Sequence, residues 1–416
     1  MTRREFMMRG LMAAGAGAIA GCISDDRSDF AADGRYPGWK KGEFDIHFIQ
    51  TGTGEQTFFI FPDGTTMLLD CGDMYRPQYL RHVPRQPSDA RLGGEWVSRY
   101  VQRLIPERSI DYFVLSHWHA DHCGHPELRS EKTADGRTVC GITRFAEDFA
   151  IRHYFDHQYP RSGVYRRNAD DASLEMMRRW IPYMRRKCGM AAHEFKVGAL
   201  NQIAMLRDPG CCPDFSVRNL FANAVYWNGD SGSGLTDFAP RYFAKHPDAG
   251  GGIPENTLSL GIRFQYGPFR AYFGGDIDLP EYEELLGPVV GPVDVCKTNH
   301  HACPSSMGAA FCRSVRAQAY MTSVWSPNQI DARNLVNMAS RELYPGDRVI
   351  LPGYLPEIKR REYAPRAFMH DIPPVQGHSV FKVAPGGGTF KLFILDAGDE
   401  SMRVLYRREF VSGVNA

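Results

Sequence analysis

The sequence predicts a mixed α/β fold, and three observations support this. Short apolar and aromatic runs, such as residues 111–115, have the character of buried strands. Residues 95–104 and 172–188 place apolar side chains at helical spacing. A chain of 416 residues with 43% hydrophobic and 23% charged content can bury a sizeable core. The net charge of +1 gives no global attraction to nucleic acid or anionic membrane.

The first 22 residues are expected to be an export signal that takes no part in the fold. Arg3 and Arg4 precede a small-residue apolar stretch that is too short to span a bilayer, which resembles a twin-arginine signal. Residues 19–22 resemble a lipobox, in which the thiol of Cys22 would be acylated. An ordinary cleaved signal peptide with a chance cysteine is the alternative. Residues 23–43 are acidic and then rich in Gly and Pro, as expected for a solvated tether. We therefore expect a lipid-anchored protein of the bacterial cell envelope, with the membrane as partner and no specific protein partner implied.

The main domain is expected over residues 44–416 and begins with a predicted hairpin. Its strand-like runs, 57–61 and 65–69, are joined by a Pro-Asp-Gly turn signal. The second run ends at Asp70-Cys-Gly. A carboxylate that leaves a strand end beside Gly can turn back towards a metal site and support its ligands. Capping of a turn is the alternative role for Asp70.

The densest polar cluster follows the predicted strand 111–115. His117, His119, Asp121 and His122 form the pattern His-x-His-x-Asp-His. Imidazole nitrogen suits zinc and similar ions, and a carboxylate adds a harder oxygen ligand. Four such groups within six residues can hardly point the same way, so they suit two adjacent metal ions better than one. For a lone histidine, a polar turn would be the simpler interpretation.

Residues 126–250 show a weaker pattern and are expected to form an insertion beside this cluster. The helix predicted at 172–188 has a basic face, which is ordinarily just solvated, with phosphate steering as the sharper alternative. Its basic residues are Arg178, Arg179, Arg185, Arg186 and Lys187.

Two further strand ends carry polar residues. The predicted hairpin of residues 257–264 and 269–273 ends at Gly274-Gly-Asp276, where two glycines let the backbone crowd close to a ligand. Asp276 is thus a candidate carboxylate bridge between two cations. The predicted strand 293–297 runs into His300-His301. Two strand-like runs in residues 376–408 are expected to complete a sheet.

These residues, taken in order, resemble the metallo-β-lactamase superfamily of binuclear metallo-hydrolases. The resemblance runs from about residue 44 to about residue 320 and rests on Asp70-Cys-Gly, His117-x-His-x-Asp-His, Gly-Asp276 and His300-His301. Within the superfamily the chain is most similar to the ComEC-type branch, the hydrolase portion of DNA-uptake channels and its stand-alone exported relatives. Residues 256–260 and 294–301 carry that likeness. The branch usually has Gly after its paired histidines, where this chain has Ala302.

The resemblance implies a four-layer αβ/βα sandwich with an insertion between the histidine motif and the bridging Asp. It also implies two divalent metal ions, zinc first, with manganese or iron as alternatives. Many members have a further His about twenty residues before the bridging Asp, where this chain has Asn256 beside Glu255. Asn256 and Glu255 are therefore candidate additional ligands. By carry-over, His117 and His119 would hold one metal and Asp121 and His122 the other, with Asp276 bridging and either His300 or His301 completing the second site.

Such a site would hold a hydroxide between its ions, which attacks a phosphorus or carbonyl centre while Asp121 orients it. We therefore expect an exported, lipid-anchored hydrolase, with a small or oligomeric phosphodiester substrate favoured by the ComEC-type resemblance. An amide or ester substrate, such as a lactam or lactone, is the alternative. A redox di-iron enzyme is less favoured, because such relatives typically carry Glu in place of His119. A non-catalytic metal- or glycan-binding lipoprotein is the remaining interpretation, and Asn256 is the only residue that favours it.

Overall fold

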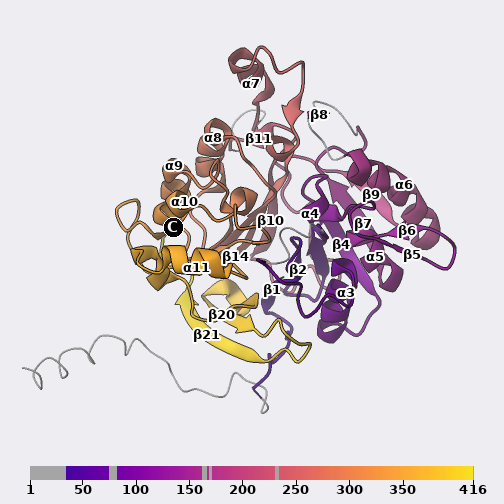
Figure 1. Cartoon of the computed structure of the whole chain (residues 1–416), viewed down its shortest axis with the longest axis horizontal. Coiled ribbons are helices and arrows are strands. Elements are labelled where there is room, and N and C mark those ends of the chain that lie inside the picture. The colour runs from indigo at the N-terminus through magenta and orange to yellow at the C-terminus, as the bar shows by residue number, and fades with distance from the viewer. Residues whose placement is uncertain (1–33, 75–81, 162–165, 168–170, 230–233, 416) are drawn as a thin grey trace, which may run out of the picture.

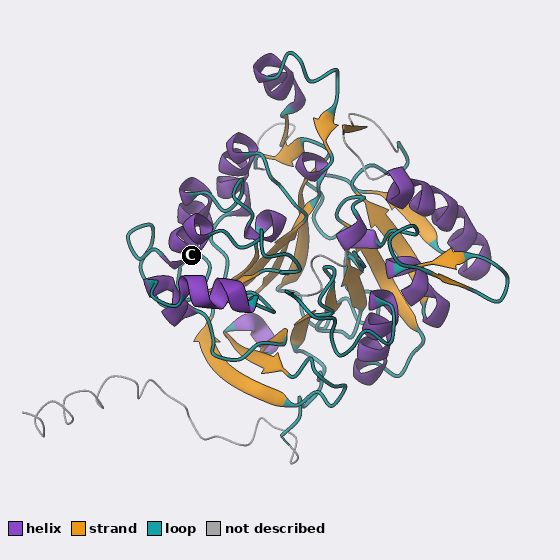
Figure 2. Cartoon of the chain, viewed as in Figure 1, coloured by secondary structure: helices purple, strands orange, loops and turns teal. Residues whose placement is uncertain are grey.

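Two large β-sheets lie face to face in the centre of the molecule, with helices on both outer sides (Figures 1 and 2). The structure is a computed structural model that describes residues 34–74, 82–161, 166–167, 171–229 and 234–415. The expected leader, Cys22 and the first part of the tether lie outside these residues. The layered arrangement agrees with the four-layer sandwich, so the predicted fold class is confirmed.

The first sheet has nine strands in the order β21-β20-β19-β1-β2-β3-β4-β7-β9. The pairs β3–β4, β4–β7 and β7–β9 are parallel, while the pairs from β21 to β3 are antiparallel. The bounds are β1 Phe44–Phe48, β2 Thr57–Ile60, β3 Thr66–Leu69, β4 Ser109–Leu115, β7 Ala150–Asp156, β9 Ala191–Glu194, β19 His378–Val383, β20 Thr389–Leu395 and β21 Val404–Val411.

The second sheet has eight strands in the order β12-β11-β10-β14-β15-β16-β17-β18. Strands β15 to β18 pair in parallel, and the rest of the sheet is antiparallel. The bounds are β10 Phe215–Ala222, β11 Val225–Trp227, β12 Leu235–Asp237, β14 Gly261–Tyr266, β15 Phe269–Gly274, β16 Val295–Lys297, β17 Ala319–Met321 and β18 Val349–Leu351. Two small two-stranded sheets pair β5 Glu131–Lys132 with β6 Thr138–Val139 and β8 Arg166–Arg167 with β13 Ile253–Pro254.

The helices divide between the two outer faces in chain order. In Figure 1, α3, α5 and α6 flank one sheet, and α8 to α11 flank the other. The bounds are α3 Gly93–Leu104, α4 Ala120–Cys123, α5 Gly141–Asp148, α6 Asp171–Cys188, α7 Ala239–Lys245, α8 Pro280–Val290, α9 Ala309–Val315, α10 Ala332–Ala339 and α11 Glu357–Tyr363. Short 3-10 turns are η2 Asn256–Leu258, η3 Asn299–Ala302, η4 Ala367–Asp371 and η5 Pro385–Gly387. No helix in the described part of the chain has the length and apolar character needed to cross a bilayer.

The main core fills the space between the sheets, where aromatic side chains of alternate strand positions meet. Phe59 of β2 stacks on Phe264 of β14 with ring centroids 4.9 Å apart, and Phe273 of β15 meets Phe59 edge-on at 4.9 Å. Each sheet also packs on its own helices through a further apolar cluster, one for the first sheet and one for the second. Burying each such ring stabilises the fold by roughly 1.5–3 kcal/mol before entropy is counted.

Most predicted elements are present, with shifts of one or two residues at their ends. The hairpin, the strand before the histidine cluster and the helices at 95–104 and 172–188 all form. The strand predicted over 257–264 is wrong at its start: residues 256–258 form η2, because Asn256 and Thr257 donate side-chain hydrogen bonds to Asp278. The tail adds a third strand, β21. Residues 126–250, expected as an insertion, supply β7 and β9 to the first sheet and β10 to β12 to the second.

Candidate metal centre

The four polar segments found in the sequence come together because they follow neighbouring parallel strands. Strand β3 runs parallel to β4, so Asp70 and the loop that starts at Ser116 leave the first sheet at the same edge. Strand β15 runs parallel to β16, so Asp276 and the η3 turn leave the second sheet together. Loops at the carboxyl ends of parallel strands commonly carry binding residues.

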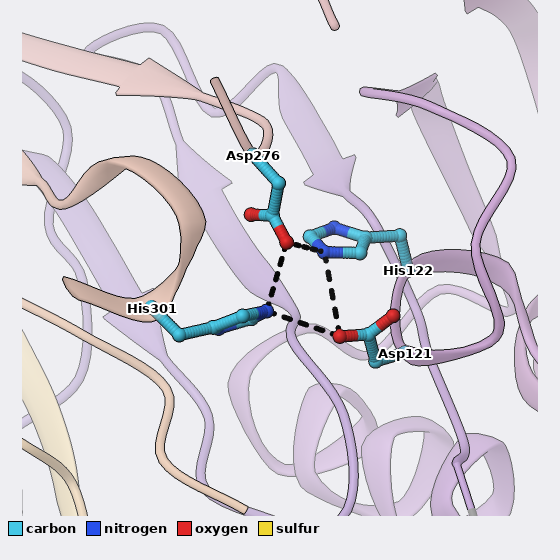
Figure 3. A group of neighbouring side chains, drawn as sticks. All are labelled: Asp121, His122, Asp276 and His301. Atoms are coloured by element: carbon cyan, nitrogen blue, oxygen red, sulfur yellow. Dashed lines mark hydrogen bonds and ion pairs between the residues drawn. The ribbon is translucent and has the colours of Figure 1, made fainter. Parts of the chain in front are cut away.

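Asp121, His122, Asp276 and His301 form one buried group in which a ligating atom from each lies within 4.8 Å of the others (Figure 3). His301 Nε2 is 2.9 Å from Asp276 Oδ2 and 3.0 Å from Asp121 Oδ2. His122 Nε2 is 3.1 Å from the same Asp276 oxygen and 3.8 Å from Asp121 Oδ2. We call this group the four-residue cluster.

The other two histidines of the motif lie beside this cluster and face each other. His117 Nε2 is 3.1 Å from His119 Nδ1, and the His117 ring lies 4.1 Å from that of His122. His117 is fully buried, whereas His119 is half-buried. The motif therefore divides into two pairs, as four ligand groups serving two adjacent ions would.

Asp70 contacts the histidine motif through His122 and Ser116. Its Oδ2 lies 2.8 Å from His122 Nδ1, and its two oxygens accept hydrogen bonds from the backbone N–H and hydroxyl of Ser116, each at 2.7 Å. A carboxylate on the outer nitrogen of an imidazole fixes which nitrogen faces inward. Asp70 therefore contacts His122 from outside the four-residue cluster, and its role as a support for the ligands stays a prediction.

Two glycines let the backbone approach these segments closely. A β-carbon at Gly72 would lie 1.7 Å from the Asp121 carbonyl oxygen, and one at Gly275 would lie 2.5 Å from Ser259 Oγ. Neither contact leaves room for a side chain. Ser259 Oγ instead accepts a hydrogen bond from the backbone N–H of Asp276 at 3.0 Å, which fixes the start of that segment.

The structure distinguishes the paired histidines. His301 is 1% exposed and joins the cluster, whereas the half-buried His300 has its Nε2 3.4 Å from Asn256 Nδ2. Residues 300 to 302 all adopt left-handed backbone, with φ of 39°, 51° and 54°. This conformation costs about 1–2 kcal/mol per L-residue, so surrounding contacts must hold it.

Glu283 of α8 supplies some of those contacts. Its carboxylate accepts hydrogen bonds from Asn299 Nδ2 at 2.8 Å and from the backbone N–H groups of Met307 and Gly308 at 2.6 and 2.8 Å. On the other side of the turn, Asn334 Nδ2 donates to the Ala302 carbonyl at 2.9 Å.

The candidate additional ligands Glu255 and Asn256 differ in their surroundings. Glu255 Oε1 accepts a hydrogen bond from the Trp118 backbone N–H at 2.8 Å and lies 3.1 Å from His157 Nε2. Asn256 Nδ2 donates to Asp278 at 3.0 Å, and its buried Oδ1 has no hydrogen-bond partner among the described residues. An orphaned buried oxygen is costly, so Asn256 has an unused ligand atom next to His300.

Burial and neighbouring charges shift the pKa values of the groups in the centre in opposite directions. Burial alone would lower the pKa of His301, but the carboxylates of Asp276 and Asp121 raise it to about 9. Burial would raise the pKa of Asp276, yet His301, His122 and Lys297 hold it well below its ordinary value. Burial, reinforced by His122 and His119, lowers the pKa of His117. For Glu255, the effect of burial is outweighed by His157, and its pKa falls to about 2.

Sequence reasoning gave no role to two buried residues, Glu55 and Lys297. Lys297 Nζ lies 2.9 Å from Glu55 Oε1 and 3.1 Å from Asp276 Oδ1. The sequence contained a signal for Lys297, because a lone charged residue in the buried strand β16 requires a partner. Glu55 lies in the loop between β1 and β2, where no pattern marks it.

The residues fit divalent metal ions. Imidazole nitrogens and carboxylate oxygens are ligands that zinc and similar ions take. Four carboxylates, those of Glu55, Asp70, Asp121 and Asp276, are buried close together, and negative charge in a protein interior is costly unless cations balance it.

Comparison with known proteins finds one family model that matches part of the chain. Residues 51–184 match the family model described as "Metallo-beta-lactamase superfamily". No curated protein sequence matches the chain. Among solved structures, the chain is similar to Zn(2+)-bound PqqB from Methylobacterium extorquens, at 10% identity and a TM-score of 0.35, over 72% of this chain and 93% of that one. The likeness to the ComEC-type branch stays a prediction. The residues that match the metallo-β-lactamase superfamily model include Asp70 and the whole His-x-His-x-Asp-His motif.

Proposed function

We propose that this protein is a metal-dependent hydrolase with two adjacent divalent-metal sites. The observation that carries the proposal is the four-residue cluster, in which ligand atoms from three separate segments meet within 4.8 Å in a buried position. Packing alone does not explain this group, because burying apolar residues of similar size would cost less free energy than burying two carboxylates and two imidazoles.

The residues would divide the ligands between the two sites. His117 and His119 would bind the first ion, and Asn256, whose buried Oδ1 has no hydrogen-bond partner among the described residues, is a candidate to complete it. Asp121, His122 and His301 would bind the second ion. Asp276 Oδ2 lies 3.1 Å from His122 Nε2 and 2.9 Å from His301 Nε2, so it would bind the second ion as well. That Asp276 would also reach the first ion rests on the family resemblance. Zinc is the first candidate by ligand type, with manganese and iron as alternatives.

Each residue has a defined task in hydrolysis. When bound, the ions would supply Lewis acidity to a water and to the substrate. Asp121 would orient the attacking water, because one of its oxygens faces His301 and the cluster. Asp70 would keep Nε2 of His122 turned inward through its contact with Nδ1. Since the cluster is buried, its charges act at a lower dielectric than in bulk water.

A phosphodiester is the favoured substrate, and this choice rests on the resemblance of residues 256–260 and 294–301 to the ComEC-type branch. The same site could hydrolyse an amide or ester. We also propose export and lipid anchoring through Cys22, which rests on the twin-arginine and lipobox patterns alone. Incorporation of labelled palmitate in the host cell, lost in Cys22→Ser, is the measurement that checks the anchor.

The decisive experiment combines metal content with turnover. Purified protein loaded with zinc or manganese should contain about two ions per chain and hydrolyse bis-(p-nitrophenyl) phosphate. Asp121→Ala should abolish turnover, while Asp111→Ala, which removes a buried carboxylate bonded to Thr66 in the same sheet, should retain it in the folded fraction. Two bound ions without turnover would favour an amide or ester substrate. Protein that binds no metal would refute the hydrolase proposal.

A further inference from the structure

Lys297 lies buried directly behind the four-residue cluster, and its ammonium group is fully engaged. Its Nζ contacts Glu55 Oε1 at 2.9 Å, Asp276 Oδ1 at 3.1 Å and the Gly275 carbonyl oxygen at 3.1 Å. A lysine carries three N–H donors, so these three acceptors use all of them. The side chain is 1% exposed, which leaves its position fixed by these contacts.

The contact with Lys297 divides the two oxygens of Asp276. Oδ1 lies 3.1 Å from the ammonium nitrogen. Oδ2 faces the Nε2 atoms of His122 and His301 (Figure 3). A charge-assisted hydrogen bond of this kind holds a carboxylate in one rotamer. Asp276 therefore presents a single oxygen to the cluster.

Glu55 connects the same lysine to His301. Its Oε1 pairs with Lys297, and its Oε2 lies 3.5 Å from His301 Nδ1, while neither Oε2 nor Nδ1 has a hydrogen-bond partner among the described residues. The Glu55 backbone N–H donates to the Asp121 carbonyl at 2.8 Å, which fixes the residue between two members of the cluster. Histidines that ligate a metal almost always donate their other N–H to a carboxylate, carbonyl or water.

We propose that Lys297 and Glu55 act as a positioning pair for the metal centre. Lys297 restricts Asp276 to one ligating oxygen, and Glu55 turns His301 so that Nε2 faces the cluster, while the two charges of the pair compensate each other. The inference rests on the proposed function, since it requires that the cluster binds metal.

If Lys297 acted on the metal only through its charge, its substitution would change metal affinity in the opposite direction from a loss of positioning. Removal of the Lys297 charge alone would strengthen cation binding, because a like charge leaves the site. Loss of positioning would weaken it. The double variant Lys297→Met/Glu55→Gln removes one charge of each sign, so its effect on metal affinity reports positioning free of a change in net charge.

The chain offers a matched control pair far from the cluster. Lys382 of β19 is also buried and pairs with the half-buried Glu43 and with Asp45, the latter at 3.2 Å. Lys382→Met/Glu43→Gln makes the same chemical change without touching a cluster residue. If the pair of Lys297 and Glu55 only stabilised the fold, the two double variants should have the same effect on metal affinity.

The test is Co²⁺ binding by the full chain, followed by competition titration and by the visible absorption spectrum of the bound ion. We expect Lys297→Met/Glu55→Gln to bind Co²⁺ at least about tenfold more weakly, with an altered spectrum, since loss of such supports typically costs 10–100-fold. The Lys382→Met/Glu43→Gln control should bind as the wild type does. Wild-type affinity in the first variant, or an equal loss in the control, would overturn the proposal.

A second variant covers the case in which the double substitution does not fold. Glu55→Asp keeps the charge but withdraws the carboxylate from both Lys297 and His301, so Co²⁺ affinity should again fall about tenfold. Unchanged affinity in Glu55→Asp would refute the positioning role. Failure of the wild-type protein itself to bind Co²⁺ would instead refute the proposed function, so the two ideas fail separately.

Discussion

Substitution of the paired histidines should have very unequal effects on metal binding. The perturbations are His301→Ala and His300→Ala, two identical truncations at adjacent positions. His301 Nε2 lies within 3.0 Å of carboxylate oxygens from both Asp121 and Asp276, so its loss removes one of the four groups of the cluster. His300 is half-buried and has its Nε2 3.4 Å from Asn256.

The magnitude follows from what each side chain touches. Removal of a residue that merely orients a ligand costs about 10–100-fold in metal affinity, so loss of a ligand should cost at least about 100-fold, or about 2.8 kcal/mol. A side chain outside the ligand set should change the free energy of binding by about 0.5 kcal/mol or less, which is about twofold. The two variants should therefore differ by well over tenfold in affinity.

The assay is competition for Zn²⁺ against a chromophoric chelator, with circular dichroism as a check that both variants fold. His300→Ala serves as the matched control for the loss of an imidazole. A larger loss in His300→Ala than in His301→Ala would refute the assignment of His301 to the second site, and with it the orientation of the whole η3 turn.

Three other expectations follow from the same structure. Asn256→His supplies the imidazole that the first site lacks, so Zn²⁺ titration should show that ion bound at least about tenfold more tightly; unchanged affinity would place Asn256 outside the site. The Glu283 carboxylate accepts hydrogen bonds from Asn299 Nδ2 and from two backbone N–H groups. Glu283→Gln replaces one of its oxygens by an NH₂ group that faces these donors, so the free energy of unfolding in urea should fall by about 1–3 kcal/mol. An unaltered urea midpoint would contradict this anchoring role. Burial lowers the pKa of His378 to about 3, so below about pH 6.5 the unfolded chain binds a proton that the folded chain does not, and stability is lost as the pH falls. Between pH 7 and pH 5 this group should cost about 2 kcal/mol, and His378→Asn should remove that part of the pH dependence in urea unfolding at the two pH values.

The strand ends were predictable from the sequence because the change from apolar to polar residues is local. An apolar run such as residues 111–115 predicts a buried strand, and the polar residues that follow it predict a functional loop. Parallel pairing within the first sheet then brings Asp70 next to the loop of His122, and parallel pairing within the second sheet brings Asp276 next to His301. The packing of the two sheets against each other brings these two edges together.

The choice between His300 and His301 was not predictable, because the alternation of side chains along a strand no longer applies in the η3 turn. Three successive left-handed residues, held by Glu283 and Asn334, set the direction of each imidazole. L-residues avoid this conformation unless tertiary contacts impose it. The interpretation of residues 257–258 as strand failed for a related reason, since side-chain hydrogen bonds to Asp278 outweigh the β-propensity of Thr257.

The two proposed sites are unequal, and this inequality has one structural origin. The second site draws its ligands from both sheets and is supported by Asp70, Glu55 and Lys297. The first has two histidines from a single loop and, as its candidate third ligand, the amide oxygen of Asn256, which is a weaker ligand than imidazole for zinc. If Asp276 Oδ2 binds both ions, the contact of Asp276 with Lys297 also fixes a ligand of the first site. The effect on metal affinity should be larger there, because the first site has fewer other ligands. The support behind the second site would thus also govern the occupancy of the first.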